Sequence, residues 1–440
     1  MKTQRAIVVG GGVAGLSAAF GLLDRGFAVE LIEAHGWLGG RAFTLPDRGA
    51  VTGCDNGPHV MIGGYARTRA LLRRLGTEQH FLRGRSLALA VRDAAGRASR
   101  LALPPGPTRI GFGFGLARFG GLAPRERLRA VRGLCALLRR PGATASVEDW
   151  IVRHRQQGAP RDYLWDPMCR ALMNAEASRV DAGLFVATLH RAFGGAGRDA
   201  ALWLPTRPWG ELIGEPAETK LRAAGARLTK GLAMERILVE DGRAVAVAFR
   251  GGSIRRLLPG EQIVAAVPWH ALARALPGLD LPFARLVGSP IVSVYFAVTS
   301  EADLPQDALI ALAGGSPFHF FARRPGSPTF ALLSGGHSDL RAESAEGTIA
   351  LARAQLARHF PELAELARRA PARLVKEARA TFVAAPGTAA LRPAPGPLPQ
   401  VRGLSVCGDW TATGLPATLE GAAESGLLAA SSLAAAVRAT

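Results

Sequence analysis

Cysteine is scarce in this chain, and its few cysteines stand far apart. The 440 residues contain four, Cys54, Cys135, Cys169 and Cys407, and no two of them form a C-x-x-C pair. Disulfide frameworks and zinc sites need cysteines at short, paired spacings, so we expect neither of them and no metal site. The pattern is typical of a protein in a reducing compartment.

Long apolar runs and acidic residues are also in short supply. No uninterrupted apolar segment reaches the roughly 20 residues that cross a bilayer. Asp and Glu number 35 against 54 basic residues, which gives a net charge of +19. A surface of this sign attracts anionic lipid or nucleic acid. Because no basic run is interleaved with aromatic residues, we exclude nucleic acid and favour an anionic membrane surface as partner.

Apolar residues, in contrast, are plentiful. Hydrophobic residues make up 48% of the chain and charged residues 20%, a composition that buries a sizeable core. A length of 440 residues predicts two or three domains. The basic start before an apolar run imitates a signal peptide but lacks a cleavage site. That apolar run carries a nucleotide motif instead, so we expect a cytoplasmic protein.

The nucleotide motif is a glycine loop between two expected strands. Residues 6–9 are apolar and β-branched, the loop GGGVAG follows at 10–15, a helical pattern covers 16–23, and residues 28–33 form the next strand, ending in an acid. This order is the β-α-β fingerprint of dinucleotide binding, in which glycines admit the pyrophosphate and the acid accepts from a ribose diol. The residues expected to bind here are Gly10, Gly12, Val13, Ala14, Gly15, Glu33 and Ala34.

Two stretches after this acid resemble flavoproteins of the amine oxidase and carotenoid desaturase superfamily. The first is Gly-Gly-Arg at residues 39–41, where Gly40 brings the backbone against the cofactor and Arg41 neutralises phosphate charge. The second is CDNGPH at residues 54–59, which resembles the superfamily's loop beside the isoalloxazine ring and contains Gly57, Pro58 and His59. The resemblance implies FAD. Because no cysteine stands at an attachment point, we expect it to be bound non-covalently.

The C-terminal stretch CGDWTATGLPATLEG has the same resemblance. A short apolar run ends in Gly408 and Asp409, and a glycine- and proline-containing loop leads to an expected helix that begins at Thr418 and Leu419. In the superfamily this element returns to the nucleotide domain. The resemblance implies that Asp409 binds the ribityl or pyrophosphate region, while the backbone of Thr418 and Leu419 faces the flavin ring.

Because its motifs lie at both ends of the chain, the FAD-binding domain must be discontinuous. A hairpin pattern at residues 234–247 also belongs to it, and the resemblance places the adenine against the backbone near Met234. We predict an α/β fold with a Rossmann-like FAD-binding domain of residues 1–84, 206–271 and 396–440. An interleaved α+β substrate domain comprises residues 85–205, a helical part, and 272–395, a sheet part.

Several stretches together resemble one family, the hydroxysqualene dehydroxylases of hopanoid biosynthesis. They are DNGPHVMIGGYARTRALLRRLG, LWDPMCRALMNAEASRV, LPTRPWGELIGEPA, SPIVSVYFAV and CGDWTATGLPATLEGAAESG. The resemblance implies reductive dehydroxylation of hydroxysqualene to squalene with reduced flavin as hydride donor. It also implies a polyisoprenoid lipid substrate and squalene-pathway prenyl transferases as partners. An acid should protonate the leaving hydroxyl, and the candidates are His59 and Asp166.

Other readings stay open. A structural hydrogen bond would equally explain His59 in the flavin loop, and a helix start would explain Asp166 before Pro167. A carotenoid or phytoene-type desaturase, or an amine oxidase, would use the same fold in the oxidative direction. A flavin-bearing lipid carrier would use it without turnover.

Residues 110–140 are the candidate membrane contact. They place Phe112, Phe114, Leu116 and Phe119 beside the arginines 118, 125, 127, 129 and 132, and they end in an apolar run followed by Arg139 and Arg140. Apolar residues beside arginines suit the interface of an anionic leaflet. An ordinary amphipathic helix packed on its own core has the same pattern.

Overall fold

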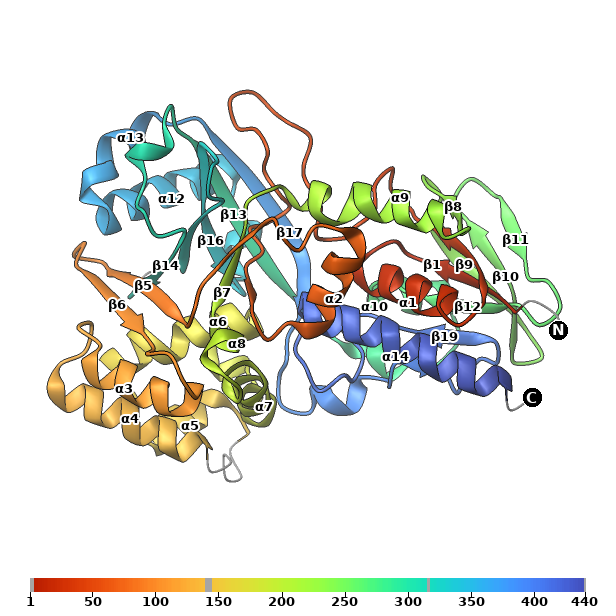
Figure 1. The fold of residues 1–440 in the computed structure, drawn as a ribbon, viewed down its shortest axis with the longest axis horizontal. Helices are drawn as coiled ribbons and strands as arrows, with labels where there is room; N and C mark the ends of the chain where they lie inside the picture. Colours follow the sequence, from red (N-terminus) through yellow and green to blue (C-terminus); the bar gives the residue numbers. More distant parts are fainter. Residues whose placement is uncertain (1–3, 139–144, 315–316, 439–440) are drawn as a thin grey trace.

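A computed structural model describes residues 4–138, 145–314 and 317–438. The ribbon has two parts, which lie side by side along the long axis of the molecule (Figure 1). One part contains both termini and the first glycine loop, and the other contains a large sheet and a group of helices. Among the described residues, no helix is long and apolar enough to cross a bilayer.

The first part is built on a six-stranded sheet in the order β18-β19-β12-β1-β2-β8. Its pairs are parallel except for β18 with β19. These strands come from three distant pieces of the chain: β1 (Arg5–Val9), β2 (Ala28–Ile32), β8 (Arg227–Thr229), β12 (Gln262–Ala265), β18 (Gly396–Pro397) and β19 (Leu404–Val406). After the exposed Arg5, strand β1 is apolar and buried on both faces, as a central parallel strand requires.

Helices from both ends of the chain pack together on this sheet. Helix α1 (Val13–Leu23) lies against the C-terminal helix α14 (Leu419–Arg438), and Gly21 and Gly426 allow the two backbones to approach. Helices α2 (Ala66–Leu75), α9 (Glu215–Ala223) and α10 (Trp269–Ala275) complete this part. A separate antiparallel sheet holds the expected hairpin as β9 (Met234–Glu240) and β10 (Arg243–Phe249), with β11 (Ile254–Arg256) at its edge.

The second part contains a seven-stranded sheet in the order β17-β13-β16-β15-β14-β5-β6, antiparallel except between β14 and β5. Its strands are β5 (Ala88–Asp93), β6 (Ala98–Ala102), β13 (Gly288–Ala297), β14 (Leu309–Ala313), β15 (Phe320–Arg323), β16 (Thr329–Gly335) and β17 (Ala372–Phe382). Helices α11 (Asp339–Ala342), α12 (Ala345–His359) and α13 (Ala364–Arg369) belong to the same piece of chain. A small sheet of β3 (Met61–Ile62), β7 (Leu202–Pro205) and β4 (Phe81–Arg83) joins residues 1–84 of the predicted FAD-binding domain to residues 85–205 of the predicted substrate domain.

The remaining helices lie in the lower half of the second part, with α3 and α4 at the side away from the termini and α6, α7 and α8 nearer the middle of the molecule (Figure 1). They are α3 (Thr108–Arg118), α4 (Pro124–Leu138), α5 (Val147–Arg153), α6 (Asp166–Met173), α7 (Ala182–Phe193) and α8 (Gly197–Ala200). Phe112, Leu116 and Phe119, which the sequence placed among the membrane-contacting residues, are buried, so that assignment is wrong for these three. Arg139 and Arg140 lie outside the described residues.

The mixed α/β class with a parallel sheet is confirmed. The parallel sheet is drawn from three pieces of the chain, residues 5–32, 227–265 and 396–406, and the large sheet from residues 88–102 and 288–382. The domain boundaries themselves stay a prediction. All four cysteines are unpaired thiols, and Cys407 is fully buried directly after β19.

Candidate functional site

The glycine loop sits at the end of β1, at the edge where the parallel strands finish. Gly10 has φ +109°, and a Cβ there would lie 2.5 Å from the carbonyl oxygen of Ala266. A Cβ on Gly15 would lie 1.9 Å from the oxygen of Gly10, so helix α1 can begin this close to the loop only with glycine there. Val13 and Ala14 are buried at the start of that helix.

Glu33 reaches back across the loop from the end of β2. One carboxylate oxygen accepts from the Gly11 N–H at 2.6 Å, and the other accepts from the His35 N–H at 2.8 Å. The side chain is 6% exposed, and the neighbouring Ala34 is exposed. The acid is therefore fixed beside the loop, as the dinucleotide fingerprint requires of a ribose-binding carboxylate.

The start of helix α1 suits an anionic group. Gly12 gives no side-chain cap, and the first turn contains no acid. The first backbone N–H groups can therefore point at a phosphate. Gly40 approaches with φ +62°, and a Cβ on it would lie 2.9 Å from the Cα of Gly12. The backbones of Gly12 and Gly40, which have no side chains, thus face each other at a helix N-terminus. This arrangement fits the pyrophosphate of FAD.

An ion pair joins the two ends of the chain at this site. Arg41 contacts the carboxylate of Asp409 at 2.7 Å, and Asp409 is 5% exposed. The Arg41 guanidinium also donates to the carbonyl of Ala380 at the end of β17. Three distant segments therefore converge on the predicted cofactor loop. The sequence predicted both charged residues at the cofactor but not their pairing.

The predicted flavin-facing segment forms the start of helix α14. The Thr418 hydroxyl accepts from the Gly421 N–H at 3.0 Å, which caps the helix. Leu419 is partly buried against the core under the six-stranded sheet. Glu420 is buried and accepts from the N–H groups of Arg67 and Thr68, so it fixes the first turn of α14 to the first turn of α2.

Arg392 is a site residue that the sequence interpretation missed. Its guanidinium is buried, and it donates to the carbonyls of Trp410, at 3.1 Å, Leu415, at 2.8 Å, and Thr411. Burial lowers its pKa to about 10, against the raising influence of Asp409. The side chain holds residues 409–415, the loop between the predicted cofactor carboxylate and α14. The one sequence signal is a single arginine within a proline-rich, apolar connection.

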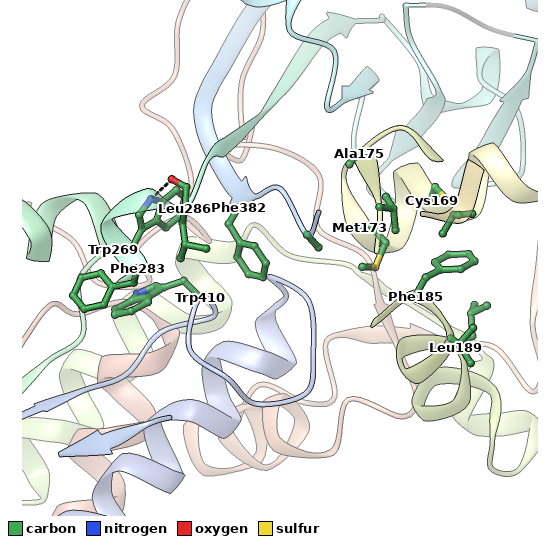
Figure 2. Packing of buried hydrophobic residues seen from close by; sticks show 14 of the residues in the cluster. Cys169, Met173, Ala175, Phe185, Leu189, Trp269, Phe283, Leu286, Phe382 and Trp410 are labelled. Carbon is green, nitrogen blue, oxygen red and sulfur yellow. Dashed lines mark hydrogen bonds between the residues drawn. The ribbon is translucent and has the colours of Figure 1, made fainter. Parts of the chain in front are cut away.

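Buried aromatic side chains pack against the same loop. Trp410 packs on Phe283 with ring centroids 4.9 Å apart, and its indole N–H donates to the carbonyl of Val267 at 3.0 Å. Figure 2 shows Trp269, Leu286 and Phe382 beside this pair. These rings are buried, so the loop packs against the apolar core on its side away from solvent.

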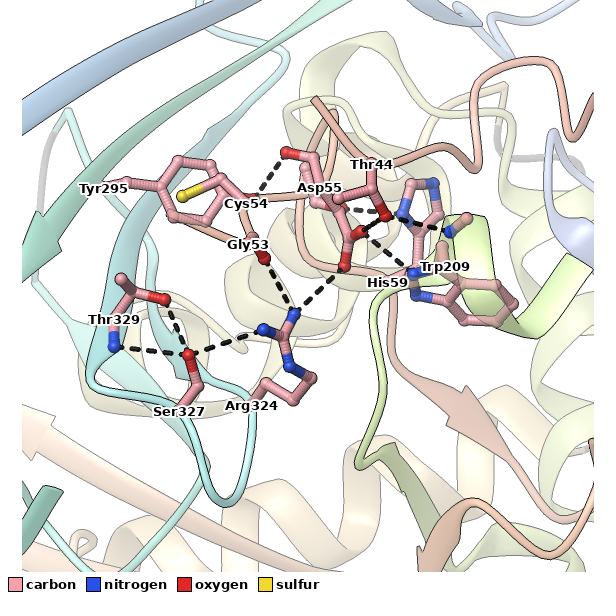
Figure 3. Close-up of polar contacts among 12 residues, drawn as sticks. Thr44, Gly53, Cys54, Asp55, His59, Trp209, Tyr295, Arg324, Ser327 and Thr329 are labelled. Carbon is pink, nitrogen blue, oxygen red and sulfur yellow. Dashed lines mark hydrogen bonds and ion pairs between the residues drawn. The ribbon is translucent and has the colours of Figure 1, made fainter. Parts of the chain in front are cut away.

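The stretch Cys54–Asn56 is held by a buried carboxylate. Asp55 accepts from the Thr44 hydroxyl at 2.8 Å and from the Trp209 N–H at 2.9 Å, and Arg324 lies 3.7 Å away (Figure 3). Burial raises the pKa of Asp55 to about 6, although the bonds from Thr44 and Trp209 oppose that shift. The Tyr295 hydroxyl donates to the Asp55 carbonyl at 2.8 Å and ties this stretch to β13.

The two candidate acids have different surroundings. His59 stands edge-on to Trp209, and its Nδ1–H donates to the Gly57 carbonyl at 2.7 Å, with Pro58 between them. Burial lowers the pKa of His59 to about 4, so the ring is neutral at pH 7. Asp166 opens α6 in the other part of the molecule and pairs with Arg161 at 3.0 Å.

Met234 begins β9 near the acid of the fingerprint. The residue two positions before it, Leu232, donates its N–H to the carbonyl of Glu33 at 3.0 Å. The structure thus brings together the glycine loop, Glu33, the segment at Met234, Arg41, Gly408–Asp409 and the start of α14. It leaves Asp166 outside this group. The roles of all these residues stay predictions.

Comparisons with known proteins place the chain among flavin-dependent oxidoreductases. A family model described as flavin containing amine oxidoreductase matches residues 13–434. A protein of Rhodopseudomonas palustris named hydroxysqualene dehydroxylase is 30% identical over 434 residues, which covers 98% of this chain and 99% of that protein. A protein of the same name from Sinorhizobium fredii is 29% identical and covers 96% of each chain.

Solved structures share the fold. A putative protoporphyrinogen oxidase from an Exiguobacterium species superposes with a TM-score of 0.71, covering 99% of this chain and 100% of that one, at 16% sequence identity. At that identity the likeness concerns the fold alone.

Proposed function

The chain belongs to the flavin containing amine oxidoreductase family and is an FAD-dependent oxidoreductase, and from this premise we propose that it converts hydroxysqualene to squalene. The observation that carries the proposal is the match over nearly the whole length to proteins named hydroxysqualene dehydroxylase. The strongest local support is the loop of residues 408–419, which is both the most specific stretch of that resemblance and the segment held by Arg392.

The proposed reaction replaces an allylic hydroxyl by hydrogen. The C–O bond breaks, the oxygen takes a proton and leaves as water, and the carbon accepts a hydride. Reduced FAD supplies that hydride when it is bound. A positioned acid typically contributes about 10²–10⁴-fold to such a step. His59 and Asp166 are the candidate donors: His59 lies in the loop with Gly57 but is neutral at pH 7, and Asp166 is paired with Arg161.

Anaerobic single turnover tests the reaction. The FAD-loaded protein is photoreduced, mixed with hydroxysqualene, and followed by flavin absorbance and by lipid extraction. We expect flavin reoxidation with one squalene formed for each flavin. Reoxidation without squalene, or no reoxidation at all, contradicts the proposal. Reduction of the oxidised protein by phytoene or by an amine would assign it to the oxidative members of the superfamily, and binding without any redox change would make it a lipid carrier.

We further propose that the enzyme works at a membrane surface, supplied by squalene-pathway prenyl transferases. Each CH₂ gains about 0.8 kcal/mol on leaving water, so a lipid of roughly thirty carbons gains on the order of 20 kcal/mol. Such a substrate resides in the bilayer, and an enzyme that uses it must take it from there. The excess of basic residues supports an anionic leaflet as the surface.

A further inference from the structure

Helices α3 and α4 leave large apolar side chains exposed on one surface. Ile110 is 61% exposed, Phe114 is 56% exposed and Leu128 is 52% exposed. All three border one hollow of about 530 Å³ between the two helices, together with Gly113 and Val131. Contiguous exposed apolar surface of this kind marks an interaction site. We call these three residues the α3–α4 patch.

The glycines of α3 explain why its apolar residues face outward. A Cβ on Gly115 would lie 2.9 Å from the carbonyl oxygen of Ala102, so the helix sits close on β6 through its glycine face. Phe112 fills the inner side and packs on Phe193 at 5.5 Å between ring centroids. Gly113 has no atom within 4 Å of a Cβ position, which leaves the hollow open beside Phe114.

Exposed arginines lie on the same two helices as the patch. Arg118, Arg125 and Arg132 are exposed on the same two helices, and within residues 4–138, 145–314 and 317–438 none of them has an acidic partner. Arg127 and Arg129 differ, because each donates to backbone carbonyls. A second hollow of about 520 Å³ at the start of α3 is bordered by Arg85 and Arg198.

We propose that the α3–α4 patch, with Arg118, Arg125 and Arg132, docks on an anionic lipid bilayer. Apolar side chains that enter the acyl boundary beside cations that meet anionic headgroups are the physical basis of interfacial binding. A second copy of the chain fits poorly, since it would bring the same arginines against one another. The helices lie at the end of the molecule opposite the termini, so the contact leaves the nucleotide part clear of the membrane (Figure 1).

The lipid supply argument rests on the proposed reaction, but the patch and its charge do not. The test therefore measures vesicle binding of the full FAD-loaded chain without substrate. Vesicles of phosphatidylcholine alone are compared with vesicles containing phosphatidylglycerol, at low and high salt, by co-sedimentation. We expect binding to the anionic vesicles that weakens at high salt. Dehydroxylation of detergent-dispersed substrate is measured separately, so failure of the reaction and failure of the contact are distinguishable.

Variants on the patch and on another surface make the test specific. Phe114→Glu with Leu128→Glu should weaken binding by at least about tenfold, because two apolar contacts become anions. Ile254→Glu with Leu258→Glu, at residues 55% and 44% exposed on the nucleotide part, is the matched control and should change little. Each of Arg118→Gln, Arg125→Gln and Arg132→Gln should weaken binding about fivefold.

Flavin absorbance shows that each variant is folded. The proposal is overturned if the parent protein binds neither kind of vesicle, or if the patch variant binds as well as the control.

Discussion

Replacing Arg392 by methionine tests whether the loop of residues 409–415 is shaped for the cofactor. The guanidinium is 8% exposed and donates to the carbonyls of Trp410, Thr411 and Leu415. Methionine is apolar and follows the aliphatic stem of arginine, but it has no guanidinium and donates nothing. The Arg392→Met protein therefore keeps the stem and loses the bonds.

Two opposing effects set the magnitude. A buried carbonyl left without a donor costs about 1–3 kcal/mol, so three of them cost about 3–9 kcal/mol. Against this, the arginine has its charge buried without a carboxylate of its own, and its pKa falls from 12.5 to about 10. That shift corresponds to about 3 kcal/mol at about 1.4 kcal/mol for each pKa unit. The cost of the unpaired carbonyls exceeds the gain from removing the buried charge, and we expect a net loss of about 3 kcal/mol in stability.

This loss should appear in FAD binding, because the same loop joins Asp409 to the start of α14. If FAD binding must first order this loop, the free energy of ordering it lowers the affinity for FAD. We expect the dissociation constant of FAD, measured by titrating the apoprotein, to rise about 100-fold in Arg392→Met. Arg392→Lys keeps the charge but cannot donate from a planar fork, so its affinity should lie between the two.

Arg353 provides the matched control. It also donates to two carbonyls, of Ala367 and Ala370, but it belongs to α12 and not to the nucleotide part. Arg353→Met should lower thermal stability without changing the affinity for FAD. If Arg392→Met lowers stability as Arg353→Met does and still binds FAD like the parent, Arg392 is a structural residue and the reasoning is refuted.

Three further predictions concern the same part of the molecule. Glu33→Ala and Asp409→Ala should each raise the FAD dissociation constant about 10–100-fold, since each removes a charged acceptor of about 1.5–3 kcal/mol; full flavin occupancy in both purified variants would place the cofactor elsewhere. Acid precipitation should release all the flavin, and yellow colour retained in the pellet would show a covalent bond. Asp55 has a folded pKa of about 6, raised from 3.8, so its contribution to the free energy of unfolding is present below about pH 4 and is lost as the pH rises to about 6. The Asp55→Asn side chain can still accept from Thr44 and Trp209. In urea unfolding, the free energy of unfolding of the variant should therefore rise relative to that of the parent as the pH increases from about 4 to about 6. A constant difference between the two proteins from pH 4 to 7 would show that Asp55 does not titrate there.

The sequence was sufficient for the parts of the site that are local. The glycine loop, helix α1 and Glu33 follow one another within 25 residues, and their spacing alone predicts the turn, the helix and the acid. The hairpin of β9 and β10 is local in the same sense. The resemblance placed both Arg41 and Asp409 at the cofactor, but their ion pair was not predicted, because no periodic pattern connects residues so far apart.

Other features depend on tertiary contacts that leave no local pattern. Arg392 binds backbone carbonyls, which every residue has, so no residue type marks its partners. Helix α3 is apolar or glycine on nearly every side, so its periodicity does not tell which phenylalanine faces the core. The inward side is chosen by the carbonyl of Ala102, which excludes side chains at Gly115.

The charges around the predicted cofactor loop bear on the direction of the proposed reaction. Arg41 and Arg392 lie beside Asp409, Glu377 also acts on Arg41, and the start of α14 adds a positive helix end. A positive helix end stabilises an anionic, reduced cofactor and so makes hydride donation less favourable. A weak hydride donor needs a strong hydride acceptor. An allylic cation, formed when an allylic hydroxyl is protonated and leaves as water, is such an acceptor. The proposed reaction therefore depends on the residue that protonates the hydroxyl. Comparing His59→Ala and Asp166→Asn in single-turnover experiments locates that residue.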